Sequence, residues 1–151
     1  MLRLSKLTDY AVVVMTRLDD LGGAASAPGL AAATGIAEPT VAKVLKVLAQ
    51  SDLVISTRGA QGGYRLARPL SSMPLSDVIV AVDGPIALTA CVDGAIGGCD
   101  AEATCPVRGR WDPVNAAVRA ALSAITLADL QRPAPTPHKT AHIAASSLAA
   151  E

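Results

Sequence analysis

Apolar residues recur at helical spacing in the first twenty residues of the chain. The positions that fall on one helix face are Leu7, Ala11, Val14, Met15 and Leu18. They predict a helix over 7–21, with Thr8 and Asp9 as capping residues and Gly22 at its end.

Two shorter helices are predicted next. Ser26 is a suitable N-cap for a helix over 28–34, and Pro39 opens a second helix. The small Ala31, the turn residue Gly35 and the apolar Val41 then follow at helix-turn-helix spacing. An ordinary pair of antiparallel helices would show the same pattern, so both interpretations stay open on this segment alone.

Two strand-like runs, LVISTR and YRLAR, flank the glycine-rich turn GAQGG. A β-hairpin directly after a helix-turn-helix is the wing of a winged helix. Arg58 and Arg65 flank its loop, which suits contact with a phosphate backbone or a minor groove. The alternative is a solvated hairpin without a ligand.

The second half of the chain predicts two further helices. The run SSMPLSDVIVAVDG reads as a helix with Ser72 or Ser76 near its start and Gly84 at its end. A long helix follows from Trp111, and its apolar face suits association with a second subunit or packing on its own domain. The residues of that face are Trp111, Val114, Val118, Ala121 and Ile125.

The expected fold class is therefore mostly α with a β-hairpin wing. The predicted divisions are a winged helix-turn-helix domain over 1–84, a cysteine-bearing loop over 85–110, a dimerisation helix over 111–130 and a disordered tail over 131–151. Hydrophobic residues make up 51% of the 151, but aromatic ones only 2%, without any Phe. This composition favours closely packed helices over a β-sandwich, and with zero net charge it excludes disorder of the whole chain.

Charge and hydropathy narrow the class further. Residues 1–70 hold eight basic against five acidic groups, and the remainder holds five against eight, a weak indication of nucleic-acid binding. The chain has no apolar run of membrane-spanning length and no signal-peptide pattern, so we expect a cytoplasmic protein. The candidate contacts to double-stranded DNA are Pro39, Thr40, Lys43 and Lys46 from the second short helix, and Arg58, Gln61, Gly62, Gly63 and Tyr64 from the wing.

All three cysteines lie within fifteen positions. Cys91, Cys99 and Cys105 form a C-x7-C-x5-C pattern in a small, polar segment. Reduced thiolates are soft ligands for zinc or an iron–sulfur cluster, and these spacings are wider than the C-x2–4-C pairs of structural zinc. A cluster is therefore favoured, with its fourth ligand open. The candidates in the chain are Asp93, Asp100, Glu102, His138 and His142.

Several segments together carry a family resemblance. The pieces RLSKLTDYAV, LVISTRGAQGGYRLARP and LSDVIVAVDGPI, the three cysteines and Trp111 resemble the IscR/NsrR/RirA-type winged-helix regulators from Leu2 to about Leu130. The segments DGPIALTACVDG and ITLADL look most like the branch that regulates the SUF iron–sulfur assembly operon.

The resemblance implies a homodimer that reads a pseudo-palindromic operator. It also implies a [2Fe–2S] or [4Fe–4S] cluster on the three cysteines and a variable fourth ligand. Some members use a histidine where this chain has Arg108; others use an aspartate of the partner subunit, which matches Asp9 in TDYA. Pro39 and Thr40 replace the Ser-Tyr of many members, so the operator sequence does not carry over.

The expected function is a transcriptional regulator whose DNA affinity is set by an iron–sulfur cluster, at Fe–S assembly or iron homeostasis genes. A regulator of the same fold that uses zinc or cysteine oxidation is the alternative. An iron–sulfur enzyme would need catalytic acid and base groups around a substrate pocket, and no such constellation is visible in the sequence.

Overall fold

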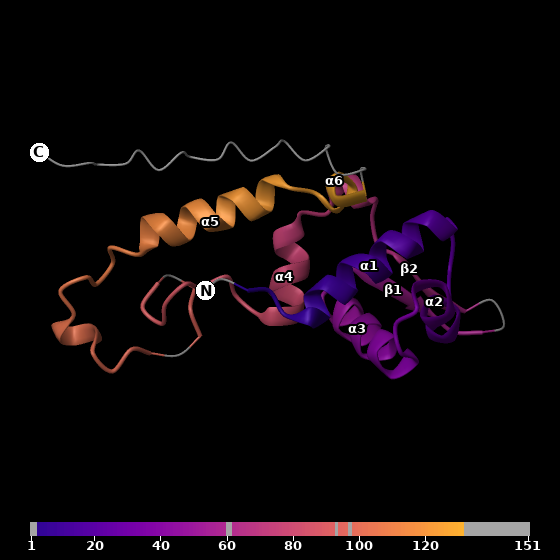
Figure 1. The fold of residues 1–151 in the computed structure, drawn as a ribbon, viewed down its shortest axis with the longest axis horizontal. Helices are drawn as coiled ribbons and strands as arrows, with labels where there is room; N and C mark the ends of the chain where they lie inside the picture. Colours follow the sequence, from indigo (N-terminus) through magenta and orange to yellow (C-terminus); the bar gives the residue numbers. More distant parts are fainter. Residues whose placement is uncertain (1–2, 60–61, 93, 97, 132–151) are drawn as a thin grey trace, which may run out of the picture.

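The computed structural model describes residues 3–59, 62–92, 94–96 and 98–131. It confirms a mostly helical fold with one two-stranded antiparallel hairpin. An arm made of α5 and the cysteine-bearing loop extends away from the helices and hairpin of the N-terminal half (Figure 1). The elements are α1 (Lys6–Leu21), α2 (Ala27–Thr34), α3 (Glu38–Gln50), β1 (Val54–Thr57), β2 (Gly63–Leu66), η1 (Leu70–Ser72), α4 (Leu75–Asp83), η2 (Glu102–Thr104), α5 (Asp112–Ala124) and α6 (Leu127–Gln131).

Helix α1 forms as predicted, but its cap differs. Ser5 is the N-cap, and its side chain accepts a hydrogen bond from the Thr8 backbone amide at 3.1 Å. Thr8 and Asp9 lie inside the first turn, so their assignment as capping residues is wrong. The Thr8 hydroxyl donates instead to Asp83 of α4 at 2.7 Å, a partner that local sequence does not reveal.

The helix-turn-helix forms as predicted. The Ser26 side chain caps α2 by accepting from Gly29 N, and Gly35 ends that helix at φ +72°. Val41 of α3 is fully buried, so it holds the second helix against the core. Helix α3 packs against both α1 and α2.

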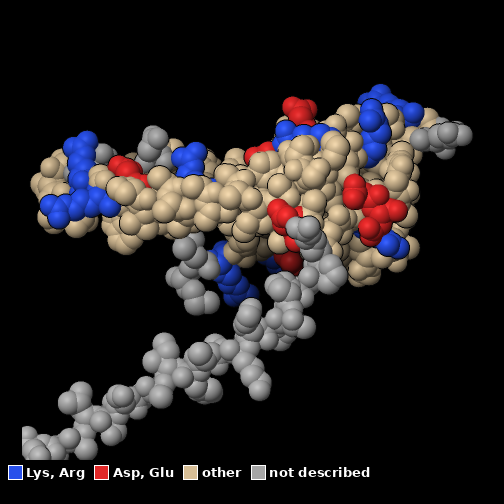
Figure 2. Space-filling model, turned by 90° about the horizontal axis from the view of Figure 1, so that it is seen from above, with Lys and Arg blue, Asp and Glu red and all other residues tan. Residues whose placement is uncertain are grey.

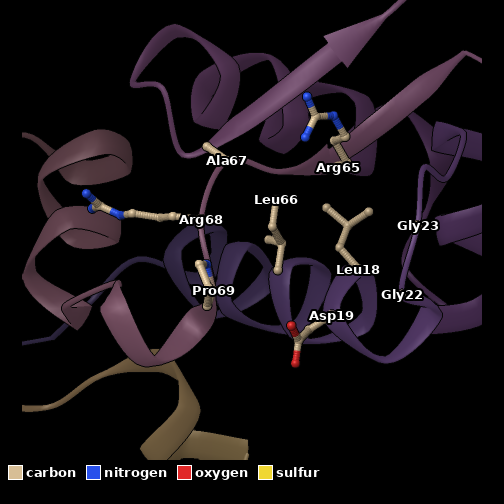
Figure 3. A pocket seen from close by; sticks show the side chains of 9 residues that line it. All are labelled: Leu18, Asp19, Gly22, Gly23, Arg65, Leu66, Ala67, Arg68 and Pro69. Atoms are coloured by element: carbon tan, nitrogen blue, oxygen red, sulfur yellow. The ribbon is translucent and has the colours of Figure 1, made fainter.

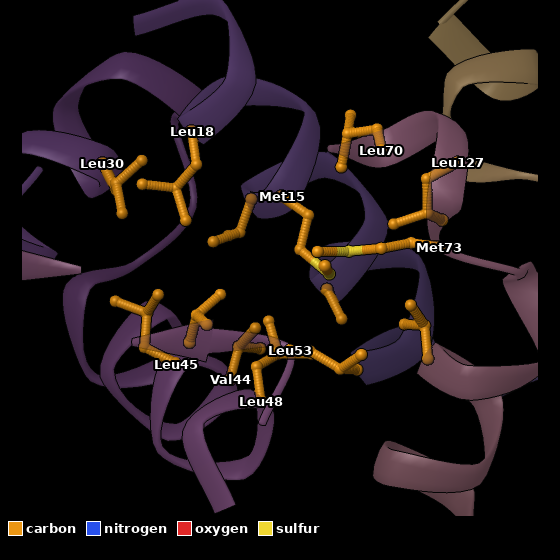
Figure 4. Packing of buried hydrophobic residues seen from close by; sticks show 14 of the residues in the cluster. Met15, Leu18, Leu30, Val44, Leu45, Leu48, Leu53, Leu70, Met73 and Leu127 are labelled. Atoms are coloured by element: carbon orange, nitrogen blue, oxygen red, sulfur yellow. The ribbon is translucent and has the colours of Figure 1, made fainter. Parts of the chain in front are cut away.

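The core joins the three N-terminal helices to the elements that follow the wing (Figure 4). Its buried residues are aliphatic or sulfur-containing, as the lack of Phe predicts. Met15 of α1 and Met73 after η1 lie between the leucines of α3 and Leu127 of α6. Close packing of such unbranched and branched aliphatic side chains is what gives a core without aromatics its density.

The hairpin is tied to the segment before α2. Val54 pairs with Leu66 and Thr57 with Gly63, in antiparallel register. Ala25 extends this sheet by exchanging two backbone hydrogen bonds with Tyr64, at 2.8 and 2.9 Å. A Cβ at Gly63 would lie 2.7 Å from the Ala25 carbonyl oxygen, so only glycine allows the wing to come this close.

Helix α4 begins without a side-chain cap. Its N-cap is Pro74, so the predicted capping by Ser72 or Ser76 is wrong. Ser72 belongs to η1, and the buried Ser76 hydroxyl accepts a hydrogen bond from Ser123 of α5 at 3.0 Å. Gly84 ends α4 with φ +87°, as predicted.

Residues 111–130 form two helices instead of one. Trp111 and Ile125 cap α5, and α6 then turns back onto η1 and α1, where Leu127 is fully buried. Two backbone hydrogen bonds join the start of α4 to the segment after α5. They run from Leu75 N to Ile125 O at 2.8 Å and from Leu127 N to Met73 O at 2.9 Å. The predicted disordered tail lies outside the described residues from residue 132 onward. None of the described helices is both long and apolar enough to cross a bilayer.

Candidate DNA-binding surface and cysteine loop

One face of α3 is exposed and carries two lysines. Pro39, Lys43 and Lys46 are exposed and recur at helical spacing, with Thr40 half-buried beside them. The buried residues of the helix fall on the opposite side, since Val44 and Leu48 face the core. Both lysines are therefore available to a phosphate backbone or to base edges in a major groove.

The wing supplies a second basic position. Arg58 follows β1 and is exposed, as is the neighbouring Gly59. Gly62 closes the turn by donating from its amide to the Gly59 carbonyl at 2.8 Å, and a Cβ there would lie 2.5 Å from the Thr57 carbonyl. Tyr64 is half-buried against the core, so its ring contributes to the base of the wing. Gln61 lies outside the described residues.

Basic side chains gather at the two ends of the elongated molecule (Figure 2). One end carries the helix-turn-helix and wing, and the other carries the cysteine loop. The arm between them shows mostly uncharged surface in this view. Acidic side chains lie beside the basic ones at the winged-helix end in the same view.

The root of the wing holds a cavity of about 450 Å³ between the end of α1 and residues 65–69 (Figure 3). Asp19, Arg65 and Arg68 line it, and Arg68 forms an ion pair with Asp77 of α4. None of the candidate DNA contacts of α3 lines this cavity.

The cysteine loop joins α4 to α5 through short turns. Among its described residues, backbone hydrogen bonds such as Val92 N to Thr89 O and Arg108 N to Cys105 O span three residues. Val92 is buried, whereas Ile96 is 84% exposed. Such local bonds leave the path of the loop easy to change.

The three thiols match the donor chemistry of an iron–sulfur cluster. Cys91, Cys99 and Cys105 are all free and half-buried. Within the described part of the chain, however, no three Cys, His, Asp or Glu side chains come together as a metal site. The three thiols are chemically suited to an iron–sulfur cluster, but the loop would have to change conformation to bring them close enough to bind one.

The candidate fourth ligands are placed unequally. Asp9 is exposed in the first turn of α1, at the rim of a cavity of about 480 Å³ that no cysteine lines. Asp100 is exposed in the loop. Asp93, His138 and His142 lie outside the described residues.

Sequence reasoning missed two polar residues that join elements on either side of residues 84–88. The Asp83 carboxylate accepts from Ser5 N at 3.1 Å and from the Thr8 hydroxyl, which joins the end of α4 to the start of α1. Partial burial raises the pKa of Asp83, but these hydrogen bonds outweigh it and hold the pKa below its usual value of 3.8. Asn115 of α5 is buried and bonds to the backbone of Ile86 and Leu88.

Replacing Asp83 by Asn is expected to lower stability in a pH-dependent way. Because the folded-state pKa is lowered, the stabilisation is fully present above about pH 4 and disappears as the pH falls through the folded-state value. We expect a loss on the order of 0.5–1 kcal/mol at pH 7 that shrinks at pH 2, measured by urea unfolding. Asp100→Asn, in the exposed loop, is the control. An equal loss at both pH values would contradict this account.

One face of α5 is uncovered in the single chain. Trp111 and Val114 are 41% and 46% exposed, and Ala121 and Ile125 are exposed on the same side. Val118 is half-buried and lines a cavity of about 280 Å³ against α4. The predicted apolar face is thus present on the arm, and its partner remains a prediction.

A helix-turn-helix with an exposed basic second helix and a hairpin wing defines a winged-helix DNA-binding protein. The Rrf2 family model, described as an iron-dependent transcriptional regulator, matches residues 4–133. The chain belongs to the Rrf2 family of DNA-binding transcriptional regulators.

Known relatives and structures agree with this assignment. The HTH-type transcriptional regulator IscR of Escherichia coli is 30% identical over 131 residues, which cover 85% of this chain and 80% of IscR. The structure of CymR, the global cysteine regulator of B. subtilis, superposes with a TM-score of 0.64 at 27% identity, over 86% of this chain and 96% of that one. T. potens IscR superposes with a TM-score of 0.60 at 29% identity, over 85% of each chain.

Proposed function

We propose that this protein is a homodimeric, cytoplasmic regulator whose affinity for double-stranded DNA is controlled by an iron–sulfur cluster. The observation that carries the proposal is the placement of three free, half-buried thiols in the loop that leads into α5, the helix with the uncovered apolar face. The likeness to IscR proteins supports the choice of cluster.

The winged-helix end performs the DNA contact in this proposal. A two-fold dimer presents two α3 helices and two wings, so its operator is pseudo-palindromic. Lys43, Lys46 and Arg58 neutralise phosphates, and Thr40 lies where α3 enters the groove. A bound cluster would supply a cross-link among the cysteines that forms or breaks with iron supply and redox state.

The controlled genes are inferred from chemistry and resemblance together. A protein that gains or loses a cluster reports the supply of that cluster, so we propose operators at Fe–S assembly (SUF) or iron homeostasis genes. Asp9 of the partner subunit is the proposed fourth ligand, because Arg108 replaces the histidine that some relatives use there.

A second candidate is a regulator of the same fold that responds through zinc or through oxidation of the bare cysteines. Two observations support this second candidate: the described thiols do not form a metal site, and the chain is similar to CymR, a cysteine regulator. Visible absorption separates the candidates, since zinc and disulfides are colourless whereas Fe–S clusters absorb strongly in the visible.

The deciding experiment combines spectroscopy with DNA selection. Protein purified anaerobically is supplied with iron and sulfide, and its absorption, iron and sulfide are measured. Both the loaded and the cluster-free forms then select duplexes from a random pool. We expect a visible chromophore and different affinities of the two forms for the selected palindrome. Colourless protein under these conditions would overturn the proposal.

Replacing Arg58 by Ala is expected to weaken DNA binding and to reduce its salt dependence. Removing one bond to a phosphate makes the slope of log K against log salt shallower by about one. A dimer with two wings should therefore change by about two. Arg119→Ala, which removes the same charge from the arm, is the control. An unchanged slope for Arg58→Ala would mean that the wing tip does not touch DNA.

A further inference from the structure

Asn115 is a buried polar residue of α5, whose other residues are exposed or half-buried. It is only 3% exposed. Its amide group donates to the Ile86 carbonyl at 3.1 Å, and its carbonyl accepts from the Leu88 amide at 3.0 Å. Both partners are backbone atoms of residues 84–88, the segment that follows α4 at the start of the cysteine loop, which we call the strap. Buried amides with both ends satisfied by one short segment fix the position of that segment.

The strap connects three parts of the molecule. At its start, the Asp83 carboxylate binds the backbone of Ser5 and the hydroxyl of Thr8 at the beginning of α1. At its end, Leu88 stands three residues before Cys91, the first thiol of the cysteine loop. The strap is therefore held by α1 at one end and by α5 at the other, directly before the proposed ligands.

Side-chain packing fills the space beside the strap only in part, because Ile86 packs against the core while a neighbouring volume stays open. A cavity of about 280 Å³ lies there, room for several water molecules. Besides the strap, its lining includes Leu4 before α1, Ile79 of α4, and Val118 and Leu122 of α5. Packed interiors transmit displacements because they lack such voids. Beside this cavity, the two hydrogen bonds of Asn115 join the strap to α5.

We propose that Asn115 is the positioning residue that passes the conformation of the cysteine loop to α5, and so to the separation of the two α3 helices in the dimer. This inference rests on the proposed function. When Cys91 is drawn toward the other cysteines, the strap moves with it, and Asn115 carries that movement into the long helix. A bound cluster changes the affinity for DNA only if it stabilises one arrangement of the dimer more than the other.

The first test compares the operator affinities of the loaded and cluster-free forms in Asn115→Leu, which has a side chain of similar size without polar atoms. We expect the ratio of the two affinities to fall by at least about fivefold, the low end of typical couplings. Ser123→Ala is the matched control, because it removes a hydrogen bond between α5 and α4 without touching the strap. Its ratio should match the wild type.

The second test needs no cluster. Alkylation of Cys91 by iodoacetamide is followed by mass spectrometry in the cluster-free protein. Asn115→Leu should speed this reaction by at least about fivefold, because the strap opens more often, while Cys105 and the Ser123→Ala variant react at wild-type rates. Asn115→Asp, which keeps the acceptor and loses the donor, should act in the same direction and provides a second variant if Asn115→Leu unfolds.

The outcomes separate this inference from the proposed function. If wild-type loaded and cluster-free forms bind the operator equally, the proposed function fails and the inference falls with it. If the wild type responds and both folded Asn115 variants respond as strongly, the inference alone is overturned. Equal effects of Asn115→Leu and Ser123→Ala would also overturn it, because general α4–α5 packing would then explain the change.

Discussion

Replacing Cys99 by Ser is expected to abolish the visible absorption of the loaded protein while the winged-helix fold and the dimer persist. A serine hydroxyl is a poor, hard replacement for a thiolate at iron. The loop contributes Val92 as its buried apolar residue among those described, so the core of α1, α3 and α4 does not depend on it. Absorption, iron content and thermal unfolding are measured on the same anaerobic preparation.

A matched variant controls for the added hydroxyl. Ala101→Ser places the same group in the same exposed loop without removing a thiol, and should keep colour and iron at wild-type levels. Full colour in Cys99→Ser would show that this cysteine is not a ligand. Loss of the folded state would show that the loop supports the core more than its short turns indicate.

Replacing Val114 by Asp is expected to separate the dimer and to weaken operator binding by about two orders of magnitude or more. Val114 is 46% exposed in the single chain, so a charge there costs the isolated fold little. In an apolar seam between two copies, the same charge loses its water and has no partner. Loss of the second half-site removes the gain from linked binding, typically 10²–10⁴-fold. Sedimentation and DNA titration measure the two effects.

The control for this variant lies on the same helix. Ala116→Asp introduces the same charge at an exposed position on a different face of α5, and should leave both the dimer and DNA binding unchanged. A Val114→Asp protein that still sediments as a dimer would mean that this face of α5 is not the interface.

Features that depend on local spacing were predictable from the sequence. Local sequence alone determines three of these features. They are the apolar periodicity of α1, the turn at Gly35 and the glycine-rich hairpin. Capping of α1 was not predictable, because Ser5, Thr8 and Asp9 all suit the role. The choice depends on Asp83, which takes the Thr8 hydroxyl from 75 residues away.

The site was predictable in its residue types more than in its arrangement. The three cysteines stand out by their spacing, and the lysines of α3 by their place after the turn. Asn115 does not stand out, because a single polar residue on a helix looks solvent-exposed until its backbone partners nearly thirty residues away are known. The packing of α6 against η1 was not predictable either. The buried Leu127 donates its amide to the Met73 carbonyl, which is distant in the sequence.

The hydrogen bonds that join the segment before α4 to the segment after α5 have a consequence for the loop between these two helices. Pro74, directly before α4, and Thr126, between α5 and α6, form a β-bridge. A change in the length or chemistry of the loop between α4 and α5 therefore leaves the path of α6 unaltered. The winged-helix part and the contact of α6 with η1 therefore do not depend on the length of the loop between α4 and α5.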